Sequence, residues 1–384
     1  MYLTSSQLLE MTEEKLLEFL ALGIPENSHL DYKISLSNKS DKESKREFLK
    51  DISGFANASG GHLIIGVQEP TQGLPPSKRL TGIDNGPETA ATLERLASSS
   101  IEPRIPGLRI FPLSIGNGRH CLIVHVPPSL GRPHMVSHDG HRSFYIRHTE
   151  SIFPMSTYEI RQAVLTSTSA EDRARNTAEL SLAQILEKNN FSQANLVLQA
   201  IPLIKPDTPW DVLNAQFTRI LNGDNRRNLF KYETLENYSR PRPTIYGISC
   251  ANKDWKNPWS CEIRRSGHII LSYKFEQLTQ ANGKEIRFLH SGNVDIFGAF
   301  LMMLDAAIEE SGNDVPYLIT AYMSKTQGLR IWTDSRHTRF SEAYDDDSIA
   351  WPEHIRQTGE AAVSLKAEFG RELFNAFGFP DIVE

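Results

Sequence analysis

Near the N-terminus, hydrophobic and polar residues alternate with a period of two, which is typical of a β-strand with one buried face. The stretch runs from 29 to 36, and its apolar residues are Leu30, Tyr32, Ile34 and Leu36. Asp31 and Lys33 share the opposite face, because residues two apart on a strand point to the same side. We therefore predict a half-buried strand with an acid and a base on its solvent face.

Helical periodicity flanks this strand on both sides. Residues 4–22 have leucines at helical spacing, and Gly23 and Pro25 end the pattern. Beyond a polar and basic connection, Ser44 and Glu47 have the spacing of a capping box and predict the start of a second helix. Its apolar face consists of Phe48, Leu49, Ile52, Phe55 and Ala56. A short apolar strand follows at 62–67.

The rest of the chain continues to mix helices and strands. Pro87 is placed to start a helix, and strands are expected at 108–115, 120–126 and 143–147. Ser156 and Glu159 repeat the capping-box spacing. We predict an α+β fold with a first domain at 1–165, a helical linker at 166–200 and a second α+β domain of unknown role at 201–384.

Length, charge and cysteine content limit the kinds of protein that the chain can be. The chain has 384 residues, 39% of them hydrophobic, so it can build more than one core. Its net charge of −6 means that nucleic-acid binding would require a local basic patch. Three cysteines without close spacing argue against a disulfide framework. No apolar run of membrane-spanning length and no signal-peptide pattern is present, so a cytoplasmic protein is expected.

Three segments occur in an order that resembles a known domain. They are ENSHLDYK at 26–33, GFANASGGHLIIGV at 54–67 and RPHMVSHDGHRSFYIRHTES at 132–151. This order resembles the Schlafen-type AlbA-like domain, known as AlbA_2, in bacterial proteins. The resemblance covers the first domain only, and the A-N-x-x-G-G turn with its flanking strand is its most specific part.

The resemblance implies a metal-dependent endoribonuclease that acts on structured RNA such as tRNA. The first acid of the family falls on Glu26 and the second on Asp31, where the family usually has Glu. The third falls on Glu69 or is replaced by Gln68. Glu26, Asp31 and Glu69 would bind Mg²⁺ or Mn²⁺. Many bacterial proteins with this domain are described as regulators, so a catalytically silent nucleic-acid-binding protein is the alternative.

The residues themselves support phosphodiester chemistry. Carboxylates are suitable ligands for hard cations, and a lysine beside them can offset charge on a transferring phosphate. Asp31 and Lys33 fit these roles, although such a pair is more often a solvated strand face. Glu26 lies an odd number of residues from Asp31, so it must reach the site from the preceding turn or across a bulge. As Asp31 is expected on a polar face, its removal should leave the fold intact.

Basic residues on both sides of the acids are candidate RNA contacts. They are Lys39, Lys42, Lys45 and Arg46 in the connection and at the start of the second helix, and Arg132, Arg142 and Arg147 in the later segment. A solvated loop and helix face explains the first group equally well. His134, His138 and His141 have some resemblance to zinc ligands, but there is no partnering cysteine pair. The Gly60-Gly61 pair is either a helix cap or a close approach to phosphate.

Assembly can also be predicted. Larger Schlafen proteins carry two copies of this domain in one chain, which form a horseshoe around RNA, and this chain has one recognisable copy. A homodimer would supply the second wall of the groove, and two-fold dimers are the commonest oligomers. The helix at 294–310 is apolar on more than one face. It is therefore either the dimer surface or the centre of the second domain's core.

Overall fold

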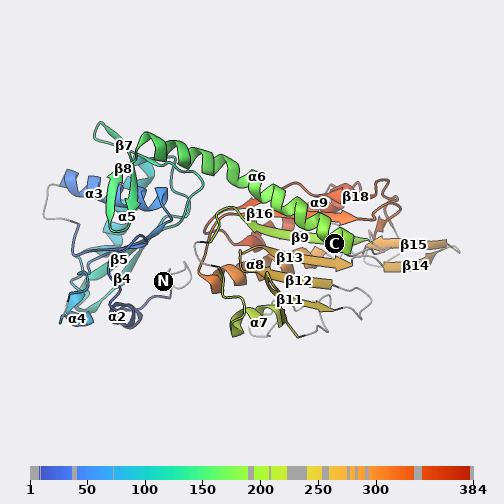
Figure 1. Cartoon of the computed structure of the whole chain (residues 1–384), viewed down its shortest axis with the longest axis horizontal. Coiled ribbons are helices and arrows are strands. Elements are labelled where there is room, and N and C mark those ends of the chain that lie inside the picture. The colour runs from blue at the N-terminus through green and yellow to red at the C-terminus, as the bar shows by residue number, and fades with distance from the viewer. Residues whose placement is uncertain are drawn as a thin grey trace. The chain divides into compact units, whose positions relative to one another are not determined.

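The structure is a computed structural model of the chain, which folds into two compact units (Figure 1). It describes residues 8, 10–36, 41–71, 73–188, 194–206, 209–222, 240–252, 259–274, 277–281, 284–289, 294–332 and 340–380. The first unit comprises Met1–Ala170 with two short later segments, and the second comprises the remainder. The division falls inside helix α6 (Thr157–Lys188), which includes 166–188 of the predicted helical linker, whereas 195–200 belongs to strand β9 (Asn195–Pro202).

A mixed four-stranded sheet forms the centre of the first unit. Its order is β1 (Leu30–Lys33), β2 (Gly61–Ile65), β5 (His120–Val126) and β4 (Arg109–Ser114). Strand β1 is parallel to β2, and the remaining pairs are antiparallel. Helix α3 (Asp41–Asn57) makes the crossover that parallel strands require. A second sheet has the order β3 (Ile101–Glu102), β6 (Met135–His138), β7 (His141–His148) and β8 (Ser151–Pro154).

Both faces of strand β1 are buried. Leu30 and Tyr32 join one core cluster with residues of helix α2 (Glu13–Ala21). Asp31 pairs with Leu63, which belongs to a second cluster formed by α3 and α5 (Gly86–Ser100). Only 2% of Asp31 is exposed. The prediction of a solvated polar face was therefore wrong for Asp31, because α3 covers that face of the sheet.

The turn between α3 and β2 is fixed by its own side chains. The Asn57 amide donates to the carbonyl oxygens of His134 and Tyr145, at 2.9 and 2.8 Å. Gly60 has a φ of +72°, and its N–H caps the helix by donating to the Phe55 carbonyl. A Cβ at Gly60 would lie 2.6 Å from the Pro128 nitrogen. The motif therefore serves as a helix cap, one of the two predicted roles.

The helix boundaries differ from the predicted ones mainly at their starts. The described part of the N-terminal helix is α2, which begins after its N-cap Thr12. Helix α3 starts at Asp41 rather than Ser44, with an acidic residue in its first turn as the helix dipole favours. The second capping box is confirmed, because Ser156 and Glu159 exchange hydrogen bonds at the start of α6. The short helix α4 (Pro76–Arg79) and the turn η1 (Gly116–Gly118) complete the unit.

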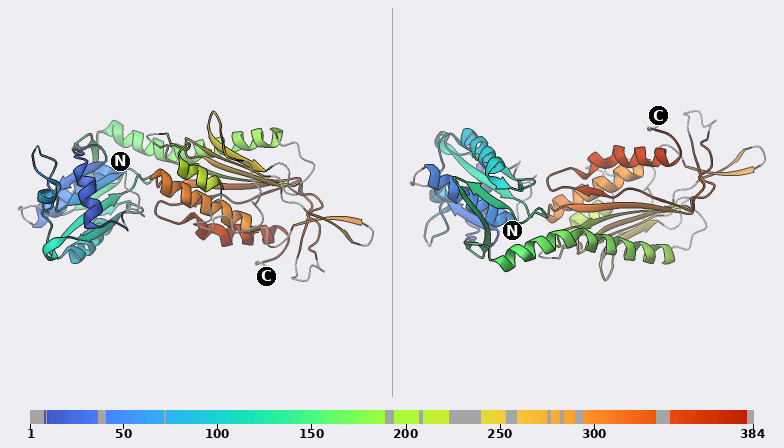
Figure 2. Two further views of the ribbon diagram at one scale, coloured as in Figure 1. Left: turned by 90° about the horizontal axis from the view of Figure 1, so that it is seen from below. Right: turned by 90° about the horizontal axis from the view of Figure 1, so that it is seen from above.

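A large antiparallel sheet organises the second unit, with the order β10-β11-β12-β13-β9-β16-β18 and β19 beside β16. Figure 2 shows α6 on one side of this sheet and helices α8 and α9 on the other. The elements are β9 (Asn195–Pro202), α7 (Ala215–Asn222), β10 (Arg242–Pro243), β11 (Gly247–Asn252), β12 (Trp259–Arg264), β13 (Ile269–Lys274), β14 (Gln277–Ala281), β15 (Lys284–Leu289), α8 (Asp295–Ser311), β16 (Tyr317–Ser324), β17 (Arg330–Ile331), β18 (Ser348–Ala350), β19 (His354–Arg356), η4 (Ala362–Leu365) and α9 (Lys366–Ala376). Strands β14, β15 and β17 form a separate small sheet.

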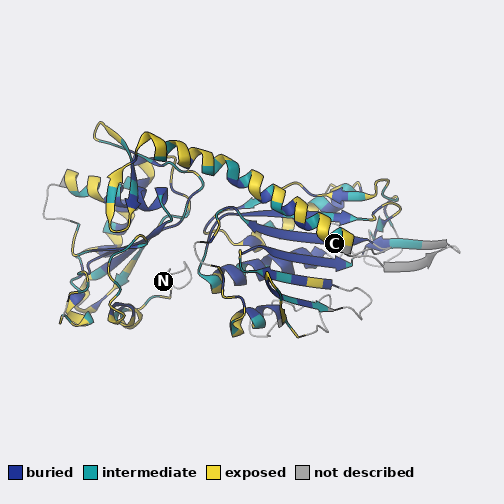
Figure 3. Cartoon of the chain, in the orientation of Figure 1, coloured by how far each residue is buried: buried dark blue, intermediate teal, exposed yellow. Residues whose placement is uncertain are grey.

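Helix α8 lies in the core of the second unit. Its residues from Ile296 to Leu301 are all buried, as are most of those up to Ile308, which Figure 3 shows as a largely dark-blue helix. The interpretation of this helix as the centre of the core therefore holds, and it leaves no apolar face for a partner. Within the described residues, no helix has the length and apolar character needed to cross a membrane.

Candidate active site

Asp31 lies between two basic side chains on the α3 face of the sheet. Its Oδ2 atom is 3.2 Å from the Lys33 Nζ and 3.6 Å from the Arg147 Nη1. Its Oδ1 atom accepts the Tyr32 backbone N–H at 3.1 Å. A buried carboxylate is tolerated only when it is paired in this way. The pairing of Asp31 and Lys33 predicted from their spacing is thus present, but it is largely enclosed.

Glu26 reaches the same place from the preceding turn, as its odd spacing required. Asn27 and Leu30 form an isolated bridge, and the Asn27 side chain accepts the His29 N–H at 2.9 Å. This turn folds Glu26 back so that its Oε1 atom also accepts the Tyr32 N–H, at 3.1 Å. Burial, a hydrogen bond with Asp31, and the charges of Asp31 and Glu69 raise the pKa of Glu26 to about 7.

Arg147 holds this arrangement together from strand β7. Its Nε and Nη2 atoms donate to the carbonyl oxygens of Asn27 and Leu30, at 2.9 and 3.2 Å. Its guanidinium lies 4.6 Å from the centre of the Phe55 ring. The side chain is 1% exposed. Sequence reasoning placed Arg147 among the phosphate contacts, whereas the structure places it behind Asp31, out of reach of a phosphate in solvent.

Asp51 on α3 is a further acid at the site, and sequence reasoning missed it. Its Oδ2 atom is 4.0 Å from the Lys33 Nζ. Burial raises the pKa of Asp51 to about 7, although the nearby Lys33 charge opposes this shift. A signal was present in the sequence: Asp51 follows Phe48 by three residues and precedes Phe55 by four, so it lies on the apolar face of the helix.

Lys33 is the basic residue of the site that solvent reaches, with 43% of its side chain exposed. Burial alone would lower its pKa, but the charges of Asp51 and Asp31 raise it overall. Lys33 is therefore a cation at neutral pH, held between two carboxylates and open on one side. This position suits a group that contacts an incoming phosphate.

Gln68 and Glu69 were the two alternatives at the position of the third acid, and Glu69 is the one whose charge acts on the site. Glu69 is exposed and contributes to raising the pKa of both Glu26 and Tyr32. Gln68 is tied by its backbone to Arg79, whose Nε donates to the Gln68 carbonyl at 2.9 Å. Among the described residues, no three His, Cys, Asp or Glu side chains are grouped closely enough to hold a metal ion.

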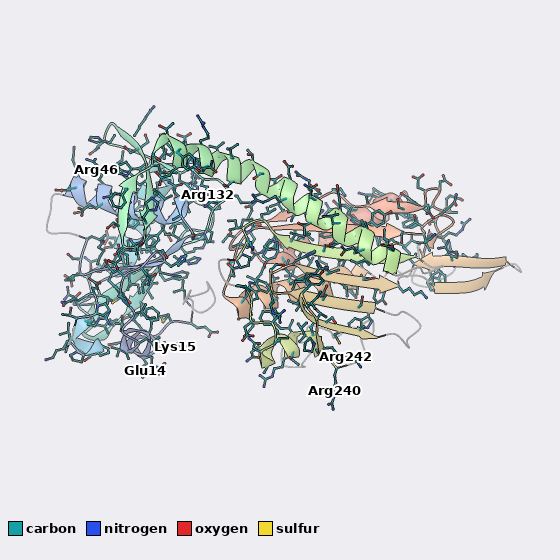
Figure 4. All side chains as sticks on the ribbon, viewed as in Figure 1. Glu14, Lys15, Arg46, Arg132, Arg240 and Arg242 are labelled. Atoms are coloured by element: carbon teal, nitrogen blue, oxygen red, sulfur yellow. The ribbon has the colours of Figure 1, made fainter. Side chains whose placement is uncertain are left out.

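The remaining basic candidates differ in exposure. Arg46 is exposed on the first turns of α3 (Figure 4), as is Lys42, and Lys45 is half-buried. Lys42 lies 3.7 Å from Asp139. Arg142 is exposed on β7, and Arg132 donates to the Ala58 carbonyl at 3.0 Å. Lys39 lies outside the described residues.

The three histidines with zinc-like spacing have other contacts. The His134 Nδ1 is 2.7 Å from the Pro103 carbonyl oxygen, and the His138 Nδ1 is 3.4 Å from the Ser100 hydroxyl. His141 is exposed on β7. Burial lowers the pKa of His134, which is fully enclosed.

Comparison with known proteins gives one family match. Residues 26–156 match the family described as Schlafen, AlbA_2. A search of curated proteins found no match. The DIP2311 protein of Corynebacterium diphtheriae is similar in structure, at 16% identity and a TM-score of 0.28, over 41% of this chain and 32% of that one. The N-terminal domain of a putative ATP-dependent DNA helicase RecG-related protein of Nitrosomonas europaea matches at 17% identity and a TM-score of 0.26, over 37% of this chain and 90% of that domain.

Proposed function

Because residues 26–156 form a Schlafen AlbA_2 domain, we propose that this chain acts on nucleic acid, as a metal-dependent endoribonuclease for structured RNA such as tRNA. One observation carries the proposal. Glu26 and Asp31 meet at the Tyr32 N–H, with Lys33 beside them and the charge of Glu69 acting on the same place. Clustered carboxylates next to a half-exposed lysine are what phosphodiester hydrolysis uses.

The donor set fits a hard divalent cation in part. Glu26 and Asp31 offer carboxylate oxygens at one point, where burial, the hydrogen bond with Asp31 and the repulsion between the two acids raise the pKa of Glu26. A cation at that point would relieve the repulsion in place of a proton. Mg²⁺ often uses only one or two carboxylates and completes its shell with water and substrate phosphate. Glu26 and Asp31 are therefore the proposed ligands of Mg²⁺ or Mn²⁺, with Glu69 as the third acid.

Each side chain then has a defined task. A bound cation would polarise the phosphoryl oxygen and activate water. Lys33 offsets the negative charge that builds on the phosphate, since its ammonium is open to solvent between Asp31 and Asp51. Arg147 keeps Asp31 and the 27–30 turn in place. Lys42, Lys45, Arg46, Arg132 and Arg142 are proposed contacts to the RNA backbone.

Two observations favour the alternative, a catalytically silent nucleic-acid-binding regulator. Asp31 is already paired with two cations, which competes with metal binding. The described residues also contain no ready group of three metal ligands. In that case the basic residues would bind nucleic acid, and the acids would serve the fold alone.

Cleavage of labelled tRNA by the purified chain, with Mg²⁺, Mn²⁺ or a chelator, distinguishes the two functions. We expect metal-dependent cleavage that falls by about 100-fold or more in Glu26→Gln and Asp31→Asn, the usual scale for losing a group that stabilises the transition state. Glu14→Gln is the matched control, because Glu14 is an exposed carboxylate on α2 (Figure 4). Cleavage by Glu26→Gln at the wild-type rate would contradict the site. Binding without cleavage in the wild type would favour the regulator.

A further inference from the structure

The second unit carries a basic and aromatic surface at the edge of its sheet. It comprises Arg240, Arg242, Ile245, Tyr246 and Arg265, and we call it the β10 edge. Ile245 is 84% exposed and Tyr246 is 57% exposed, which is unusual for such large apolar side chains. Arg240 and Arg242 are also exposed, and Figure 4 shows both side chains extending away from the sheet.

Local hydrogen bonds hold Ile245 and Tyr246 in these exposed positions. The Thr244 hydroxyl accepts the N–H groups of Tyr246 and Gly247, at 3.3 and 2.9 Å. The Thr244 N–H donates to the Gly247 carbonyl at 2.8 Å. The Arg265 N–H donates to the Tyr246 carbonyl, and its Nη1 reaches the Ile245 carbonyl. The turn is therefore built to present the two side chains, which reduces the ordering cost of binding.

The edge strands beside the turn expose polar side chains on the face of the sheet that α6 partly covers, where the Arg264 Nη1 is 3.4 Å from the Ser181 hydroxyl of α6. Arg242 pairs with Ser249, and Ser249 pairs with Glu262, so these three share one face. Ser249 and Glu262 are half-buried, and Ser260 is exposed. The alternate residues Cys250 and Cys261 are buried on the other face, where the Cys261 sulfur is 3.4 Å from the Met303 sulfur of α8. Near the β10 edge, solvent therefore reaches part of this polar face.

Charge at the β10 edge favours a polyanion. Arg264 stacks at 5.1 Å over the Tyr246 ring and is held by Glu262 at 3.0 Å. Asp211 is an exposed acid on the segment next to Arg265. The β10 edge thus contributes three arginines, and the nearby Glu262 is already paired with Arg264. Pro241 and Pro243 flank Arg242 and lack N–H groups, which disfavours the addition of a partner strand at this edge.

We propose that the β10 edge binds an unpaired segment of RNA, with a base stacked on Tyr246 and the adjacent phosphates on Arg240, Arg242 and Arg265. Aromatic side chains beside a basic track bind single strands in this way without reading sequence. This role deepens the proposed function and rests on it for the choice of RNA. It gives the second unit a task in holding substrate that is separate from cleavage.

Binding of a short fluorescein-labelled oligouridine to the full chain tests the proposal. We expect Tyr246→Ala and Arg242→Glu each to weaken binding by about tenfold, the usual scale for one stacked base or one reversed phosphate contact. Tyr246→Phe should bind like the wild type, because it keeps the ring. Arg371→Glu is the matched control for charge, because Arg371 is exposed on α9 on the other side of the sheet.

The results separate this proposal from the nuclease proposal. Wild-type affinity in Tyr246→Ala, Arg242→Glu and Arg240→Glu would overturn the β10 edge, whether or not the chain cleaves RNA. A wild-type chain that does not bind oligouridine would overturn it as well. If oligouridine binding depends on Tyr246 but tRNA is not cleaved with either Mg²⁺ or Mn²⁺, the nuclease proposal fails and the β10 edge proposal stands. Circular dichroism serves as the control for folding. We expect each variant to be folded, because the substituted side chains are exposed.

Discussion

At the scale of single residues, the first unit is unusual for the charge that it encloses. Asp31, Asp51 and Arg147 are all buried, and Lys33 lies between the two acids. Removing one partner of a buried pair leaves the other uncompensated, at a cost of about 3–5 kcal/mol. The sequence-based premise that Asp31 lies on a solvated face was wrong, and because Asp31→Ala would leave Arg147 in this state, we expect it to destabilise the fold. Asp31→Asn keeps the shape of the side chain and is the better test of chemistry.

The buried carboxyl of Asp51 predicts a pH dependence of stability. Burial raises its pKa from 3.8 to about 7 in the folded chain, so the folded state holds this proton more tightly than the unfolded state. The folded state binds more protons between these two values, and stability therefore falls as the pH rises from about 4 to about 7. In Asp51→Asn this part of the dependence should disappear.

Thermal midpoints of unfolding at pH 5 and pH 7.5 measure the effect. The stability of Asp51→Asn relative to the wild type should increase between the two values. Asp84→Asn is the control, because Asp84 is an exposed acid. If the difference between Asp51→Asn and the wild type is the same at both pH values, Asp51 is ionised in the folded chain throughout this range.

At the scale of elements, helix α3 combines three tasks. Its apolar face packs on the sheet, Asp51 on the same face contacts Lys33, and Asn57 at its end ties two other segments together. Its first turns expose Lys42 and Arg46. The helix thus contributes residues to the core, to the candidate site and to the proposed RNA contact.

Charge reversal at the start of α3 should weaken RNA binding. We expect Arg46→Glu to lower tRNA affinity several-fold and to reduce the salt dependence by about one phosphate contact, because each such contact releases counterions. Reversal of Lys42, Lys45 and Arg46 together should have a larger effect. Lys15→Glu on α2 is the single-site control, since Lys15 is also exposed (Figure 4). Equal losses in Arg46→Glu and Lys15→Glu would indicate a general charge effect instead of a contact.

At the scale of the whole molecule, the chain divides into two units with separate cores. The first contains the candidate site, and the second contains the β10 edge. A homodimer remains a prediction from the single recognisable copy of the AlbA_2-like domain, and the burial of α8 removes the surface first considered for it. We expect light scattering to give a mass of twice 43.3 kDa. A mass of 43.3 kDa in a preparation that binds RNA would show that one chain is sufficient.

The sequence by itself determined most of the elements and the resemblance of the first domain to a family. Period-two and helical patterns depend on neighbouring residues alone, so they predicted the strands at 120–126 and 62–67 and the second capping box to within a few residues. Glu26 was correctly expected to reach the site from a turn. Side chains alternate between the two faces of a strand, so a residue five positions from Asp31 on a regular strand would face the opposite side.

Only the tertiary structure decided which groups are buried and which of them meet. Asp31 and Arg147 are far apart in the chain, and their contact exists because β7 packs beside α3 and β1. A strand face is solvated or enclosed according to what packs on it, and no local pattern contains that information. The same holds for the β10 edge: the segment RPRPTIY at 240–246 contains basic and aromatic residues, and only the tertiary structure shows that Ile245 and Tyr246 are exposed beside Arg242.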